Sequence, residues 1–290
     1  AFTADEEVGL DEDGVDFLVK QHRDLVDAAM VINPDGGSGT IQRGRRLYFG
    51  VETSQKVYVT YTAETFNRGG HSSEPRPDNA IYDIADALER VRGYAFPVMW
   101  NDITITSFRQ AAASTPAPIG PAMAQFARHP GDRRAAATLS ASPFYVGQVR
   151  TTCIPTLIQG GHADNALPQS VVATVNCRIF PGVSIASVQA QIQRLAGAQI
   201  TVAPLDEYHA SDASPLRQDV VDAVTRAARA RHPGIPVIPS MASGASDGVF
   251  FRELDLPAPH TNLEVGSGSQ AYQIAAILSG MEPILPPARP

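Results

Sequence analysis

Acidic residues near the start of the chain are spaced as a metal site would require. Asp5, Glu6 and Glu7 follow one another directly, and Asp35 comes soon after the apolar segment 31–33. One carboxylate can bind a hard or borderline cation while its neighbour accepts a proton from metal-bound water. Glu6 is therefore a candidate general base, and Glu7 and Asp35 are candidate metal ligands. On this pattern alone, a solvated acidic turn is the simpler interpretation.

A histidine lies in a loop that two glycines begin and two prolines continue, with the sequence GGHSSEPRPDNAI at 69–81. The glycines permit a tight turn, and the prolines hold the chain extended up to Asp78. We expect Asp78 to cap a helix. Its predicted apolar face is Ile81, Ile84, Ala85, Leu88 and Val91. Polar loops ahead of rigid elements often carry function, which makes His71 a candidate, with a solvated turn histidine as the alternative.

The edge of a sheet could bring the acidic residues together. The strand predicted at 31–33 ends at Pro34, so Asp35 would lie at its carboxyl end, where open α/β sheets bind ligands. The interval between Glu7 and Asp35 has room for the helix predicted at 11–26 and a return strand. A parallel strand–helix–strand unit would place both carboxylates at the same edge.

The pattern of elements changes near residue 54 and again near residue 206. Between them, alternating strands at 56–65, 149–159 and 170–180 and a helix after Ser184 predict an antiparallel sheet with helices on one face. The helix–strand pattern of the first 53 residues returns at 207–290. We therefore predict an α/β domain with a mixed sheet, formed by 1–53 and 207–290, and interrupted by an α+β domain at 54–206.

Composition limits the classes of partner. The chain has 290 residues, 43% of them hydrophobic, and a net charge of −7, which argues against nucleic acid or an acidic membrane as the main partner. There is no apolar run long enough for a membrane span. The first residues do not resemble a signal peptide or a natural start, so we expect a processed or truncated chain, and the compartment stays open. For Cys153 and Cys177 we expect buried free thiols, with a disulfide as the alternative.

Six short motifs, taken in order, resemble the zinc aminoacylase/carboxypeptidase superfamily, which includes acetylornithine deacetylase, succinyl-diaminopimelate desuccinylase, aminoacylase-1 and glutamate carboxypeptidase. They are TADEEVG at 3–9, NPDGG at 33–37, GHSSEP with NAI at 70–81, GG with Asn165 and Pro168 at 160–168, CRIFPG at 177–182 and SDG at 246–248. Each motif is weak or moderate by itself. The ordered set covers most of the chain and is specific.

The resemblance implies a homodimeric amide hydrolase with two zinc ions per site. Its substrate would be an N-acyl amino acid or a short peptide with a free carboxylate. Residues 54–206 would form a lid that also mediates dimerisation. The implied roles are Glu6 as general base, Glu7 and Asp35 as ligands of one zinc each, His71 as oxyanion stabiliser in the neighbouring subunit's site, Asn165 and Arg178 as substrate ligands, and Ser246 and Asp247 as pocket lining.

Two parts of the family's pattern do not occur in this sequence. The family has a His-x-Asp motif and a bridging Asp before the Glu-Glu pair, and a histidine ligand near the C-terminus. We therefore expect a fragment or a degenerate relative whose dinuclear centre is incomplete. The alternative is a non-catalytic dimerisation or ligand-binding module that keeps the lid, His71, Asn165 and Arg178. A serine hydrolase based on Ser72 or Ser73 would need a Gly-x-Ser-x-Gly elbow, which is absent.

Overall fold

The computed structural model describes most of the chain, in two units. The described residues are 14–27, 30–33, 39–42, 44–208, 210, 213–214, 217–244, 246–253 and 261–264. The first unit takes the described residues of 1–56, 98–149 and 211–290, and the second takes 57–97 and 150–210.

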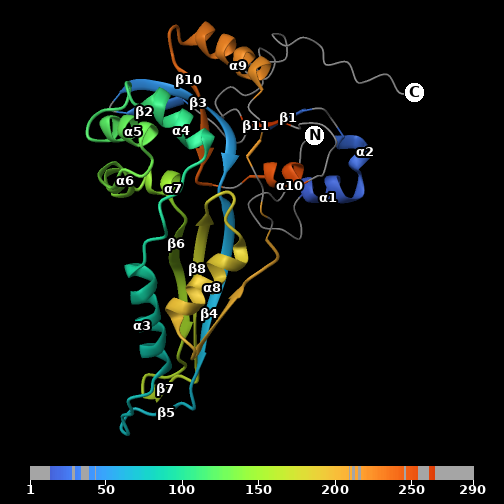
Figure 1. Ribbon diagram of the computed structural model, residues 1–290. Coiled ribbons are helices and arrows are strands. Elements are labelled where there is room, and N and C mark those ends of the chain that lie inside the picture. Colours follow the sequence, from blue (N-terminus) through green and yellow to red (C-terminus); the bar gives the residue numbers. More distant parts are fainter. Residues whose placement is uncertain are drawn as a thin grey trace. The chain divides into compact units, whose positions relative to one another are not determined.

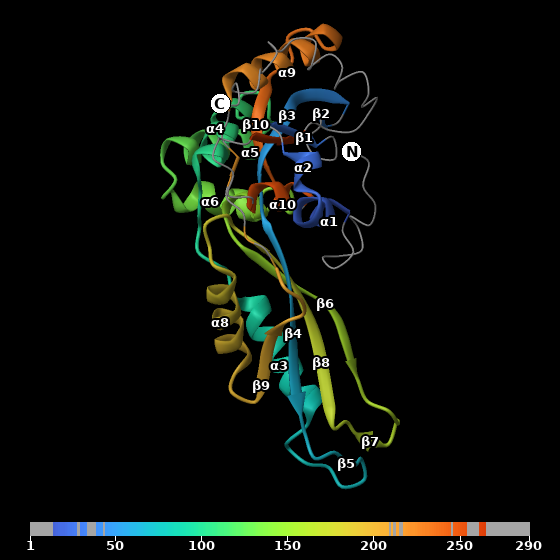
Figure 2. The same cartoon turned by 90° about the vertical axis from the view of Figure 1, so that its right-hand side faces the viewer.

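The elements are labelled in Figures 1 and 2. Their bounds are α1 Gly14–Gln21, α2 Arg23–Val26, β1 Met30–Asn33, β2 Gly39–Gln42, β3 Arg45–Gln55, β4 Val57–Phe66, β5 Gly70–His71, α3 Ala80–Gly93, α4 Asp102–Ala111, α5 Ile119–Arg128, α6 Arg133–Ser140, α7 Val146–Val149, β6 Thr152–Gly160, β7 Ala166–Leu167, β8 Ser170–Ile179, α8 Ile185–Ala196, β9 Ile200–Pro204, α9 Gln218–Arg231, β10 Val237–Ala242, α10 Gly248–Glu253 and β11 Thr261–Glu264.

The first unit is built on a mixed sheet. Its strand order is β1-β11-β3-β10, and β2 pairs with β3 outside that path. β10 runs parallel to β3 and β1 runs parallel to β11, whereas β2 and β11 are antiparallel to β3. The apolar face of α9 packs on β3, and the core there consists of Phe49, Val51, Val220, Ala223, Val224, Ala228 and Ile235.

The helical segment 98–149 groups with the first unit, whereas the sequence prediction had placed it in the lid at 54–206. The reason is a shared core: Phe108 on α4, Phe126 on α5 and Leu139 on α6 are buried together with Ile238 on β10. The apolar face of a helix must pack against another element, and β10 provides part of that packing surface for these helices. The outer ends of the second unit, at 57 and 210, lie close to the predicted boundaries.

The second unit is an antiparallel sheet of order β6-β8-β4-β9. α3 and α8 lie on one face of this sheet, and the β5–β7 ribbon lies beyond the ends of β4 and β8 (Figures 1 and 2). Alternate residues of β8 are buried under the helices, from Val171 to Ile179, as a half-covered strand requires. The predicted fold class, an α/β domain with a mixed sheet and an α+β domain, is confirmed.

α3 begins one residue later than predicted. The side chain of Asn79, rather than Asp78, caps the helix by accepting a hydrogen bond of 2.9 Å from the Ile81 N–H. Asp78 instead pairs with Arg76. The buried face is Ala80, Ile84, Ala87 and Val91. Ile81 and Ala85 are exposed, so that part of the predicted face was wrong. The predicted cap at Ser184 is confirmed, since its hydroxyl accepts from the Ser187 N–H at 3.2 Å.

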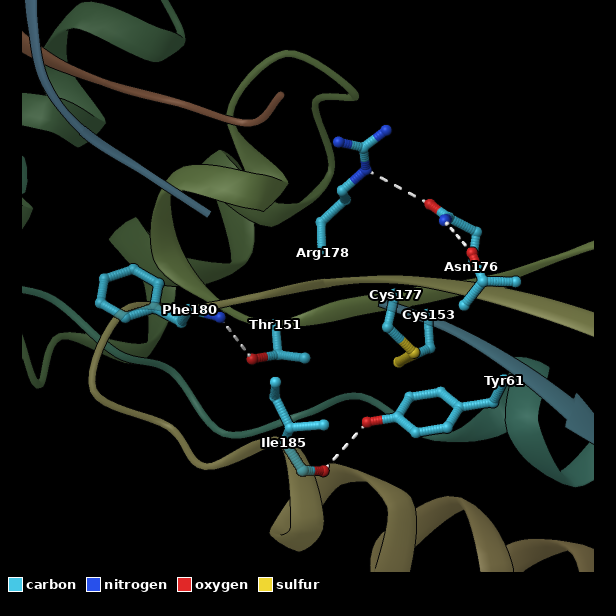
Figure 3. The surroundings of a disulfide bond; sticks show 9 residues. Tyr61, Thr151, Cys153, Asn176, Cys177, Arg178, Phe180 and Ile185 are labelled. Atoms are coloured by element: carbon cyan, nitrogen blue, oxygen red, sulfur yellow. Dashed lines mark hydrogen bonds between the residues drawn. A yellow bond between two sulfur atoms is a disulfide. The ribbon is translucent and has the colours of Figure 1, made fainter. Parts of the chain in front are cut away.

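Cys153 and Cys177 form a disulfide between β6 and β8, so the expectation of free thiols was wrong (Figure 3). The two residues are directly opposite one another, with Cα atoms 4.0 Å apart. A bulge between Pro155 and Leu157 shifts the register of β6 by one residue. Counted from Gly160↔Val171 without that bulge, Cys153 would face Arg178 instead of Cys177. The bulge therefore makes the pairing possible.

Candidate functional site

The β5–β7 ribbon brings two predicted site residues together. His71 pairs with Ala166 in the ribbon, and the Ser72 N–H donates to the Asn165 carbonyl at 2.9 Å. Both side chains are exposed, and Asn165 Nδ2 lies 3.4 Å from His71 Nε2. On the other ring nitrogen, Nδ1 lies 2.7 Å from Ser73 Oγ. An imidazole and an amide that are 94 residues apart in sequence thus form one polar pair.

Arg76 fixes the loop that carries His71. Its guanidinium donates to the Gly69 carbonyl, to Asn67 Oδ1 at 2.8 Å and to both carboxylate oxygens of Asp78. These bonds hold the pKa of the exposed Asp78 carboxyl down to about 2. Gly69 has φ +72°, and a Cβ there would lie 2.9 Å from Gln169 Cγ, so both conformation and space require glycine.

Arg178 is half-buried on the sheet face opposite the helices. Figure 3 shows its side chain and that of Asn176 on one side of β8, with the disulfide and Tyr61 on the other. Its Cζ lies 4.5 Å from the centroid of the Tyr58 ring, a cation–π contact. Its Nε donates to Asn176 Oδ1 at 3.3 Å. Among the residues that the structure describes, no carboxylate forms an ion pair with Arg178.

A short network supports this arginine. Asn176 Nδ2 donates to Thr60 Oγ1 at 3.1 Å, Thr60 Oγ1 lies 3.2 Å from the Tyr58 hydroxyl, and the rings of Tyr58 and Tyr208 are 6.0 Å apart. Desolvation lowers the pKa of the Arg178 guanidinium from its usual high value, and burial raises the pKa of Tyr208. A guanidinium stays charged despite such a shift. The outward nitrogens of Arg178 therefore present positive charge from a partly desolvated position.

The two groups of residues lie at opposite ends of one strand. His71 and Asn165 belong to the ribbon that precedes Ser170, whereas Arg178 is near the far end of β8 (Figure 2). At about 3.4 Å per residue, the antiparallel strand from Ser170 to Arg178 spans roughly 27 Å. One small substrate cannot contact both ends of the second unit in a single chain.

Ser246 and Asp247, predicted to line a pocket, belong to the first unit. Ser246 is buried, and its hydroxyl donates to Gln55 Oε1 at 2.9 Å and accepts from the Gly248 N–H at 3.2 Å. Gln55 Nε2 donates back to the Ser246 carbonyl at 3.3 Å. The Phe250 N–H donates to the Asp247 carbonyl in the first turn of α10. The Gln55–Ser246 pair therefore joins the end of β3 to the start of α10.

Glu6, Glu7 and Asp35 lie outside the described residues. Among the residues that are described, no group of three or more His, Cys, Asp or Glu side chains is placed to hold a metal ion. The described residues therefore do not form a zinc centre by themselves, because structural and catalytic zinc sites take three or four protein ligands. In this described part of the chain, no helix is long and apolar enough to cross a membrane.

Tyr58, Ser73 and Arg76 were missed as supporting residues. The alternation of β4 places Tyr58 on the same face as Thr60, but its contact with Arg178 depends on the pairing of β4 with β8. The Arg-Pro-Asp sequence at 76–78 was a readable signal for the Arg76–Asp78 pair, since the one residue between the two charges is a proline with a fixed φ. Ser73 was considered only as a possible nucleophile.

Comparison with known proteins identifies the family. The sequence-family model of the M20 peptidase dimerisation domain matches residues 53–200, which is half of the chain. The chain therefore belongs to the M20 peptidase dimerisation-domain family, and the resemblance to the zinc aminoacylase/carboxypeptidase superfamily is confirmed.

Known relatives share this fold. The chain is 26% identical over 208 residues to the N-fatty-acyl-amino acid synthase/hydrolase PM20D1 of Xenopus tropicalis, a match that covers 70% of this chain and 40% of that protein. The dipeptidase Dug1p of Saccharomyces cerevisiae is similar in structure, with a TM-score of 0.64 and 12% identity over 95% of this chain and 64% of that one. The M20 metallo-carboxypeptidase Sso-CP2 of Sulfolobus solfataricus gives 0.62 and 14%, covering 95% and 67%. The chain thus spans less than half the length of the curated relative.

Proposed function

We propose that this chain provides the lid of a homodimeric amide hydrolase that acts on N-acyl amino acids or short peptides with a free carboxylate. The observation that carries the proposal is Arg178, a half-buried guanidinium without a carboxylate partner among the described residues. Its Nε donates to Asn176 Oδ1, and its Cζ lies over the Tyr58 ring. A guanidinium in this state favours a planar anion, which its outward nitrogens bind bidentately.

Dimerisation would use the free edge of β6. This strand is at one end of the sheet order, and the exposed fractions of Ile154, Leu157 and Ile158 are 61%, 59% and 58%. An edge strand with an apolar surface is a template for pairing with another chain. In a twofold dimer, the same strand of a second copy would cover it.

The dimer would also assemble the site. A substrate carboxylate on Arg178 places the scissile amide only a few ångströms away, and the His71 of the same chain is too distant to reach it. The His71 of a partner copy is therefore proposed to donate to the oxyanion that forms when the amide carbonyl is attacked. Asn165, which lies beside His71, would contact the same part of the substrate.

The acidic residues keep their proposed roles. Glu6 would act as the general base, and Glu7 and Asp35 would be two of the ligands in a family whose members generally use zinc or another divalent metal. Ser246 and Asp247 would keep the pocket-lining role that the resemblance implies. Two carboxylates do not complete a zinc site, so further ligands would have to join them.

Mixing two inactive variants tests the whole proposal. The wild-type chain, loaded with zinc, is assayed on a panel of N-acyl amino acids and dipeptides, beside His71→Ala and Arg178→Ala. Each variant alone should be inactive. After dissociation and reassociation of an equal mixture, half of the dimers are hybrids with one intact site, so about a quarter of the wild-type rate should return.

The possible outcomes separate the candidate functions. No recovery, although both variants still dimerise, would show that His71 and Arg178 do not act across the interface. A wild-type chain that dimerises and binds carboxylates, but shows no turnover with zinc, would favour the alternative of a non-catalytic module.

A further inference from the structure

The contacts that Ser73 makes to His71 determine which nitrogen of the ring carries a proton. The Ser73 backbone N–H donates to Nδ1 at 3.2 Å, the Ser73 hydroxyl lies 2.7 Å from the same nitrogen, and Asn165 faces Nε2 at 3.4 Å. A backbone N–H can only donate, so Nδ1 must be the acceptor. A neutral imidazole has one acceptor and one donor nitrogen, so the proton belongs on Nε2.

The tautomer also fixes the orientation of Asn165. An Nε2–H needs an acceptor, and the carbonyl and amino ends of a side-chain amide occupy nearly equivalent positions. The structure has Nδ2 of Asn165 at 3.4 Å from Nε2. Asn165 therefore satisfies the Nε2–H ring once its amide is turned by about 180°, so that Oδ1 faces Nε2. The ribbon holds the two residues in place, because His71 pairs with Ala166 and the Ser72 N–H donates to the Asn165 carbonyl.

We propose that Ser73 is a positioning residue that holds His71 as the Nε2–H tautomer, with Asn165 accepting that hydrogen until a substrate oxygen replaces it. The replacement of Asn165 by a substrate oxygen rests on the proposed function, in which His71 donates to the oxyanion. The choice of tautomer does not, because it concerns the lid without substrate. The role of Ser73 follows from its hydroxyl and its N–H, both of which point at the same ring nitrogen.

The neighbouring serine is a matched control. Ser72 and Ser73 are adjacent and both exposed, but no hydrogen bond of the Ser72 side chain is found among the described residues. The Ser72 backbone N–H donates to Asn165 and is kept in any substitution except proline. Ser72→Ala therefore removes an equivalent hydroxyl without removing a contact to the ring.

Nitrogen NMR of the full chain tests the tautomer directly. Histidine is labelled with ¹⁵N, and the His71 signals are identified among the seven histidines by their loss in His71→Gln. At about pH 8, where an ordinary imidazole is neutral, the wild type should show a protonated Nε2 and an unprotonated Nδ1. Ser73→Ala keeps the backbone N–H and removes only the shorter hydroxyl contact, so it should raise the minor Nδ1–H population without reversing the preference for Nε2–H. Ser73→Thr and Ser72→Ala should keep the wild-type pattern.

Kinetics provides the second readout. Ser73→Ala should lower kcat up to tenfold with little change in KM, the range expected for one lost hydrogen bond, and Ser73→Thr should restore it. A wild-type His71 protonated on Nδ1, or a Ser73→Ala spectrum identical to that of Ser72→Ala, would overturn the proposal. A wild type without turnover would instead count against the proposed function and leave the NMR test intact.

Discussion

The guanidinium carbon of Arg178 lies over the ring of Tyr58, 4.5 Å from its centroid, and the two residues are directly paired across β4 and β8. The contact holds a long, flexible side chain in one orientation, and the bond from Nε to Asn176 restricts it further. A carboxylate that approaches from solvent therefore meets a preorganised fork. Preorganisation of this kind reduces the side-chain entropy lost on binding.

Removal of the ring should weaken carboxylate binding. We expect Tyr58→Leu to raise the dissociation constant of an N-acyl amino acid up to about tenfold, whereas Tyr58→Phe, which keeps the ring, should stay near the wild type. Arg178→Ala should cost roughly ten- to a hundredfold, as for a hydrogen bond to a charged group. Isothermal titration calorimetry measures all three. Equal affinities for the leucine and phenylalanine variants would contradict the role of the ring.

Substitution on β6 should dissociate the dimer. Leu157→Lys places a charge on the exposed edge strand, and like charges would meet in a twofold pairing of the two strands. Sedimentation velocity should then show a monomer. The control is Leu205→Lys, since Leu205 is similarly exposed, at 55%, but follows β9 at the other end of the sheet. Dissociation by both substitutions, or a monomeric wild type, would count against the edge of β6.

The Arg76–Asp78 pair should titrate at unusually low pH. The pKa of Asp78 is lowered from 3.8 to about 2, so the folded chain keeps this carboxylate ionised at a pH where the unfolded chain has protonated it. The pair therefore stabilises the loop above the ordinary pKa, and that contribution disappears as the pH falls through about 2. NMR titration of the Asp78 carboxyl carbon should return a value near the ordinary one in Arg76→Gln. An unchanged value in that variant would exclude Arg76 as the cause.

Removal of the disulfide should destabilise the second unit. The bond closes a loop between residues 24 apart in sequence, which corresponds to about 3.5 kcal/mol in the chain-entropy model. The double variant with Cys153→Ser and Cys177→Ser should unfold at a lower urea concentration than the oxidised wild type. A reductant should lower the wild-type midpoint and leave that of the double variant unchanged. Equal midpoints for the oxidised wild type and the double variant would contradict the prediction.

Ser246 should be a stability residue. Ser246→Ala leaves Gln55 Oε1 and the Gly248 N–H without this partner in a buried position, which should cost about 1–3 kcal/mol in the free energy of unfolding. Ser243→Ala, at an exposed position in the preceding turn, should change it by less than about 0.5 kcal/mol. Urea denaturation measures both, and a neutral Ser246→Ala would show that the hydroxyl has no structural role.

Local signals in the sequence identified most of the second unit. The alternation in 170–180 predicted a half-buried strand, and Ser184 ahead of an apolar face predicted the start of α8; both depend on residues close in sequence. The cap of α3 was misplaced because Arg76 binds Asp78 and leaves Asn79 to accept from the helix. That competition between neighbouring acceptors is not encoded in capping preference alone.

Long-range relationships could not be predicted in the same way. The disulfide depends on a single bulged position near Pro155, and the contact between Tyr58 and Arg178 depends on the register of β4 against β8. Burial of the 98–149 helices against β10 joins segments about a hundred residues apart, which local periodicity cannot specify. The motif order, in contrast, identified His71 and Asn165, and the ribbon brings them together.

Arg76 makes the loop that carries His71 largely self-supporting. The guanidinium joins residues 67, 69 and 78, so the loop is closed by its own side chain, and the ribbon adds only the short partner segment around 165–167. The geometry of this loop therefore depends little on the rest of the chain. Transplanted together onto the ends of another antiparallel hairpin, the two segments should keep the imidazole geometry, and the same independence would let the length of β4 and β8 change in evolution without altering the histidine that they carry.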